Sequence, residues 1–136
     1  MNKRKILVPI DGTERSMHSL KFVKEIFPKD SVDITIMTAK EIIVTTGIEV
    51  ADKMDIAKED GVRILEAAKN TMEGYSVKTY FTLGYAADEI LNKAKEDGIE
   101  IIVMTKSTKK GLTRMIGSVT TAVVKRAKSI VMIVPE

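Results

Sequence analysis

An aspartate directly follows a short apolar run near the amino end of the chain. Residues 5–10 form that run, which ends at Pro9 and a turn, and Asp11 comes next. A carboxylate in this position can contact a ligand beyond the end of a strand. It can also cap the following helix, because Asp11 and Glu14 have the spacing of a capping box. The two roles are compatible, since a capping aspartate can also face a ligand.

A basic segment in the last third of the chain is the second candidate site. Residues 105–114 hold four basic residues and no acid, and they lead to Gly117 and Ser118 at a predicted helix start. Free amides at a helix amino end, a hydroxyl and nearby lysines form a cradle for phosphate. A solvated basic loop followed by an ordinary Ser118 cap fits the same pattern. The place of this segment after a central strand favours phosphate.

Several classes of site are excluded by composition. The chain has no cysteine and one histidine, His18, so zinc–thiolate and histidine-built metal sites are excluded. It has neither a Walker A motif nor a G-x-G-x-x-G fingerprint, and no constellation for nucleophilic or acid–base catalysis. The net charge of +3 is too small to indicate nucleic acid. No apolar run approaches a membrane span, and we expect a cytoplasmic protein.

The sequence of 136 residues predicts one domain, residues 1–136, in which strands alternate with helices. Strands are predicted at 5–10, 32–39, 77–83, 99–104 and 130–134, and helices at 11–27, 50–72, 87–95 and 118–127. Strands that alternate with helices predict right-handed crossovers and a mostly parallel sheet. The fold class is therefore α/β, a three-layer doubly wound sandwich. Ligands in such sheets bind beyond the carboxyl ends of the strands, where the winding reverses, which here means after the first and fourth strands.

The long helix at 50–72 carries an apolar stripe at helical spacing. Its members are Met54, Ala57, Gly61, Ile64, Leu65, Ala68 and Met72. A glycine inside a helix costs about 1 kcal/mol relative to alanine. We therefore expect either a close approach of another element at Gly61 or a bend there. The methionines are predicted to fill the core, and they are Met37, Met54, Met72, Met104, Met115 and Met132.

Four segments resemble the universal stress protein family, from end to end of the chain. Residues 6–13 (ILVPIDGT) resemble the family's opening motif, and residues 84–90 (GYAADEI) its G-x-P-A-x-x-I segment, with alanine in place of proline. Residues 101–104 and then 117–134 resemble its carboxyl-terminal third. The resemblance implies a parallel sheet of order 3-2-1-4-5, like that of the adenine nucleotide α-hydrolases.

The resemblance also implies a homodimer. In the implied strand order the last strand, Ile130 to Val134, lies at an edge of the sheet. Only Pro135 and Glu136 follow it. An exposed apolar edge is normally covered, and pairing of two such strands about a two-fold axis would cover it.

Family members that bind ATP resemble one another at G-x-x-G-x(9)-G-[ST]. Gly117 and Ser118 match the end of this motif, whereas Met104 and Ser107 stand where its first two glycines would be. Asp11 matches the aspartate near the adenine and ribose, and Ala39 matches the position whose backbone contacts adenine. The implied nucleotide site consists of Pro9, Asp11, Ala39, Met104, Thr105, Lys106, Ser107, Gly117, Ser118 and Val119. The implied ligand is ATP, with Mg²⁺ if ATP is bound.

Two functions follow from the resemblance. The first is an ATP-binding sensor or regulator of the stress response, with at most very slow hydrolysis. The second is a nucleotide-independent dimer that acts through protein partners, which the two replaced glycines favour. A conventional enzyme of the same architecture has no motif support.

Overall fold

The computed structural model of the protein describes residues 3–43, 49–106 and 116–135. Strands and helices alternate along the described chain. They are β1 (Arg4–Pro9), α1 (Glu14–Ile26), β2 (Val32–Lys40), α2 (Val50–Asn70), β3 (Ser76–Leu83), α3 (Ala86–Glu96), β4 (Ile101–Thr105), α4 (Ser118–Arg126) and β5 (Ile130–Val134). None of these helices is long and apolar enough to cross a membrane.

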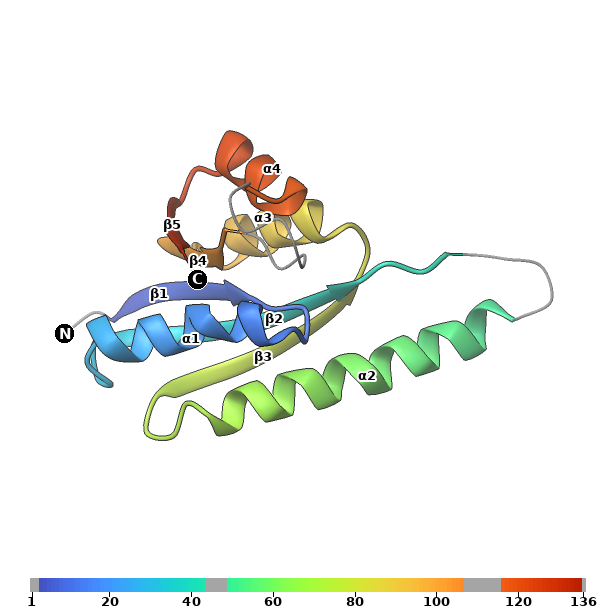
Figure 1. Cartoon of the computed structure of the whole chain (residues 1–136), viewed down its shortest axis with the longest axis horizontal. Coiled ribbons are helices and arrows are strands. Elements are labelled where there is room, and N and C mark those ends of the chain that lie inside the picture. The colour runs from blue at the N-terminus through green and yellow to red at the C-terminus, as the bar shows by residue number, and fades with distance from the viewer. Residues whose placement is uncertain (1–2, 44–48, 107–115, 136) are drawn as a thin grey trace.

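The strands form one parallel sheet in the order β3-β2-β1-β4-β5. Figure 1 shows α1 and α2 on one face of this sheet and α3 and α4 on the other. The predicted three-layer, doubly wound sandwich and its strand order are therefore confirmed.

The central strand β1 supplies both halves of the core. Ile6, Leu7 and Val8 have no solvent-exposed surface. Ile6 and Val8 belong to the apolar cluster under α1 and α2, and Leu7 to the cluster under α3 and α4. A strand that is covered on both faces needs apolar residues at successive positions, and the sequence of β1 meets that need.

Both predicted helix caps were wrong. The N-cap of α1 is Thr13, whose hydroxyl accepts a hydrogen bond from the backbone N–H of Ser16. Asp11 lies two residues earlier and accepts hydrogen bonds from the backbone N–H and the hydroxyl of Thr13, at 3.0 and 2.6 Å. Asp11 therefore orients the capping residue through an Asx-type turn. The N-cap of α4 is Gly117, and Ser118 is the first residue of that helix.

The fourth strand begins two residues later than predicted. The backbone N–H of Ile99 donates to the carbonyl of Ala94 and completes the end of α3. Ile99 is therefore buried as part of a turn, and β4 extends from Ile101 to Thr105.

The two halves of α2 have different environments. Its buried residues, Gly61, Leu65 and Ala68, all lie in the second half. A Cβ atom at Gly61 would lie 2.3 Å from two ring carbons of Phe81 in β3, so the glycine permits a close approach of helix and sheet. In the first half Met54 is 42% exposed, which makes the prediction of a core role for Met54 wrong.

We predict that Gly61→Ala destabilises the protein by about 1–2 kcal/mol. Alanine should gain roughly 1 kcal/mol of helix propensity, but the overlap with the Phe81 ring costs more, as overpacking of a core does. Urea unfolding would measure the change. In a Phe81→Ala background the same substitution should be neutral or stabilising. A wild-type protein that gains stability from Gly61→Ala would show that the close approach does not matter.

Candidate functional site

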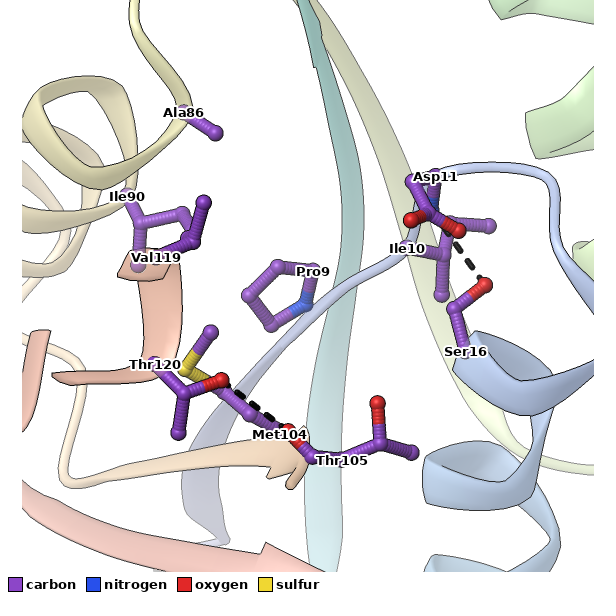
Figure 2. A pocket seen from close by; sticks show the side chains of 10 residues that line it. All are labelled: Pro9, Ile10, Asp11, Ser16, Ala86, Ile90, Met104, Thr105, Val119 and Thr120. Atoms are coloured by element: carbon purple, nitrogen blue, oxygen red, sulfur yellow. Dashed lines mark hydrogen bonds between the residues drawn. The ribbon is translucent and has the colours of Figure 1, made fainter. Parts of the chain in front are cut away.

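A pocket of about 100 Å³ lies at the carboxyl ends of β1 and β4. Figure 2 shows Asp11 and Ser16 on one side of it and Ala86, Ile90 and Val119 on the other. Its lining residues are Pro9, Ile10, Asp11, Ser16, Ala86, Ile90, Met104, Thr105, Val119 and Thr120. Helices leave β1 and β4 toward opposite faces of the sheet at this point, so the pocket lies at the switch in winding.

The turn after β1 brings Asp11 to the rim of the pocket. Gly12 has a φ of 87°, a conformation that glycine adopts without strain. A Cβ atom there would lie 2.8 Å from Ile64 of α2. The hydroxyl of Ser16 accepts from the backbone N–H of Asp11 at 3.3 Å and donates to the carbonyl of Thr13 at 2.8 Å. The carboxylate is thus held by local hydrogen bonds in an exposed position.

The end of β4 provides an apolar wall. Met104 is only 6% exposed and packs with Leu7, Ile90 and Val123 in the cluster under α3 and α4. Successive side chains of a strand point to opposite faces, so Thr105 faces the α1 side. Met104 therefore serves the core and the pocket at once.

The amino end of α4 lies beside β4. The hydroxyl of Thr120 donates to the carbonyl of Thr105 at 3.0 Å, and both residues are buried. The backbone N–H of Gly117 donates to the carbonyl of Lys106 at 2.9 Å, and the N–H of Lys106 to the carbonyl of Val134 at 3.1 Å. As Gly117 has no side chain, it offers no capping oxygen to the first amides of α4, which point out of the helix end.

The family model described as the universal stress protein family matches residues 2–135. The chain belongs to the universal stress protein family. A search of curated protein sequences gave no match.

Solved structures of similar fold cover almost the whole chain of this universal stress protein. A hypothetical protein whose biochemical function was assigned from its structure is 27% identical, with 98% of this chain and 96% of that chain covered and a TM-score of 0.70. A universal stress protein in complex with cAMP is 21% identical, with 96% of each chain covered and a TM-score of 0.73. The universal stress protein from Archaeoglobus fulgidus in complex with dAMP is 20% identical, with 98% of each chain covered and a TM-score of 0.65.

The structure brings together half of the residues predicted for the nucleotide site. Those that line the pocket are Pro9, Asp11, Met104, Thr105 and Val119. Lys106 and Gly117 are joined to each other beside it, and Ser118 is exposed in the first turn of α4. Ala39 lies near the end of β2 and is not a lining residue. Ser107 and the basic residues that follow it lie outside the described residues.

Sequence reasoning missed five lining residues of this universal stress protein. They are Ile10, Ser16, Ala86, Ile90 and Thr120. Ala86 and Ile90 belong to the GYAADEI segment, so the family resemblance could have identified both as lining residues. Nothing in the spacing of Ser16 or Thr120 distinguishes them from other helical hydroxyl residues.

The described part of the pocket has an apolar and a polar side. It combines apolar walls, one carboxylate and the amino end of a helix, where anions are stabilised. The described residues contain no group of three histidine, aspartate or glutamate side chains that could hold a metal ion.

We predict that Thr120→Val destabilises the fold by about 1–2 kcal/mol. The substitution leaves the buried carbonyl of Thr105 without its hydroxyl donor. Thr121→Val, at the neighbouring and partly exposed position, is the matched control and should change little. Equal losses of unfolding free energy in the two variants would mean that the Thr120 hydrogen bond does not hold α4 against β4.

Proposed function

We propose that this universal stress protein binds an adenine nucleotide at the carboxyl ends of β1 and β4 and acts as a sensor or regulator in the stress response. The observation that carries this proposal is the pocket between the Asp11 turn and the amino end of α4. Relatives of the same fold carry cAMP and dAMP. ATP, with Mg²⁺, is the ligand that the family motif implies.

The residues present fit the two ends of a nucleotide differently. The first amides of α4 and the side chains of Ser118 and Lys106 would face the phosphates. The carboxylate of Asp11 repels phosphate and would accept a hydrogen bond from a ribose hydroxyl. We infer that the nucleoside end lies toward β1 and the phosphate end toward α4.

Met104 limits the space for a ligand. The pocket volume of about 100 Å³ is below the roughly 300–1,000 Å³ of typical small-molecule sites, so a nucleotide would extend over the rim. At this position the family motif has a glycine, which would leave the space open. We therefore expect weaker binding than in relatives that have the complete motif.

Millimolar Mg-ATP should raise the melting temperature of the protein. At 100 times its dissociation constant a ligand that binds only the folded state adds about 2.7 kcal/mol of stability. Thermal melting and calorimetry with ATP, cAMP and dAMP would measure the effect and rank the three. The absence of both a shift and binding heat for all three would leave the partner-binding function ahead.

Two variants test the cause of weak binding. Met104→Gly combined with Ser107→Gly should tighten ATP binding, because it restores space and backbone freedom. Ser118→Ala should weaken it through loss of a hydroxyl. Each melting shift is compared with that variant's own ligand-free protein, because Met104→Gly also removes core packing. If the double-glycine variant folds and still does not bind ATP, the missing glycines are not the cause of weak ATP binding.

A second candidate function, a dimer that acts without nucleotide, is supported by β5. This strand ends the sheet beside β4, and its first residue, Ile130, is 62% exposed. An apolar edge strand invites pairing with another copy.

Light scattering should give an even multiple of the chain mass of 15.1 kDa, and Ile130→Lys should halve it. The lysine is tolerated by the single chain because Ile130 is exposed, whereas in an antiparallel β5 pair about a two-fold axis it would be placed against the apolar carboxyl end of the partner strand. Ile26→Lys, at a similarly exposed position of α1, is the control and should leave the mass unchanged. An Ile130→Lys protein of unaltered mass would exclude β5 as the interface.

A further inference from the structure

Tyr85 is an aromatic residue that the core of the protein does not use. Its side chain is 66% exposed, and among the aromatic side chains of the described residues it is the one that belongs to neither core cluster. The other two tyrosines are engaged within the chain. The hydroxyl of Tyr75 donates to the carbonyl of Phe27 at 2.7 Å, and Nζ of Lys93 lies 4.1 Å from the centre of the Tyr80 ring. Packing of the fold therefore does not require an aromatic ring at position 85.

The backbone of Tyr85 lies between the end of β2 and the pocket. On one side of it, the backbone N–H of Gly84 donates to the carbonyl of Lys40, the last residue of β2, at 2.9 Å. On the other side, Ala86 is a lining residue of the pocket. Figure 1 shows this connection from β3 to α3 beside the end of β2. An exposed aromatic residue is thus placed at the rim of the pocket, next to the end of a neighbouring strand.

The turn that carries Tyr85 is fixed by local contacts. Gly84 has a φ of 146°, and a Cβ atom there would lie 3.0 Å from Cγ of Glu89. The carboxylate of Glu89 accepts from the hydroxyl of Thr82 at 2.7 Å, and the backbone N–H of Glu89 donates to the carbonyl of Tyr85 at 3.0 Å. Tyr85 is the N-cap of α3, but its side chain forms no capping hydrogen bond. The backbone at this position is therefore pre-organised, while the ring is available to a ligand.

The proposed nucleotide site does not enclose a base. Its pocket of about 100 Å³ is smaller than typical small-molecule sites, so a nucleotide bound there extends over the rim. With the phosphates toward α4 and the ribose at Asp11, the base extends toward the end of β2, where the family resemblance implies that the backbone of Ala39 contacts adenine. Tyr85 is the exposed aromatic residue beside this end of β2.

We infer that the ring of Tyr85 stacks on the base of the bound nucleotide, an inference that rests on the proposed function. Stacking of a base on an aromatic side chain typically raises affinity about 5- to 150-fold. It depends on the flat face of the base and not on its hydrogen-bonding edge, so Tyr85 selects nucleotides over phosphate compounds without a base. It does not by itself select adenine over guanine. Tyr85 is thus a specificity residue for nucleotides as a class.

Calorimetry on Tyr85 variants tests the inference. Tyr85→Ala should raise the dissociation constant of ATP at least about fivefold and leave that of tripolyphosphate, which has no base, unchanged. Tyr85→Phe keeps the ring and should bind ATP as the wild type does. Ile26→Ala, at an exposed apolar position at the far end of α1, is the control. Melting temperatures without ligand should agree among these proteins, because both positions are exposed and the Tyr85 side chain caps nothing.

A fluorescent variant reports on stacking directly. The chain has no tryptophan, so Tyr85→Trp introduces a single indole, whose fluorescence ATP should quench and tripolyphosphate should not. A Tyr85→Trp protein that is saturated with ATP by calorimetry but not quenched would overturn the inference. So would a Tyr85→Ala protein that binds ATP as tightly as the wild type, and in either case the proposed nucleotide site would stand. If ATP, cAMP and dAMP all fail to bind the wild type, the proposed function and the inference both fail.

Discussion

The parallel pairing of β1 with both β2 and β4 is the constraint on which the rest of the molecule depends. The backbone of β1 is hydrogen-bonded along both edges, and its side chains supply apolar surface to both faces of the sheet. A strand in that position needs helices on both faces, and the chain supplies them by crossing to opposite sides after β1 and β4. The crevice between these crossovers is left without a helix above it. The location of the candidate site is thus a consequence of how the core is covered.

Two requirements on the side chain of Met104 oppose each other, namely core packing and space in the pocket. As a buried member of the cluster under α3 and α4 it contributes packing that would be costly to remove. As a wall of the pocket it reduces the volume available to a ligand. A glycine at this position would give up that packing and enlarge the pocket, so residue 104 couples the stability of the fold to the pocket volume.

The sequence predicted the fold more completely than the site. The apolar runs and the alternation of strand and helix gave the layers, and the family resemblance gave the strand order. The caps at Thr13 and Gly117 were missed because Asp11 and Ser118 belong to the same residue class as true caps, and only backbone conformation separates them. The exposure of Met54 was missed because periodicity shows which side of a helix is apolar but not where the sheet beneath it ends. The 21 residues of α2 span about 31 Å, whereas the 8 residues of β3 span about 26 Å.

The first turns of α2 extend past the end of the sheet, so the two halves of this helix differ in local stability. Near the carboxyl end of α2, Leu65 and Ala68 are buried in the core. Their amides can therefore exchange with solvent deuterium only when a large part of the domain opens. Between Val50 and Asp60 no residue is buried, and the helix is held to the rest of the chain at its edge by contacts such as those of Lys53 with Ile43 and of Asp60 with Lys40. An isolated stretch of this length is marginal in water. The amides of these turns should therefore exchange through local fraying, and the boundary between slow and fast exchange should fall near Gly61.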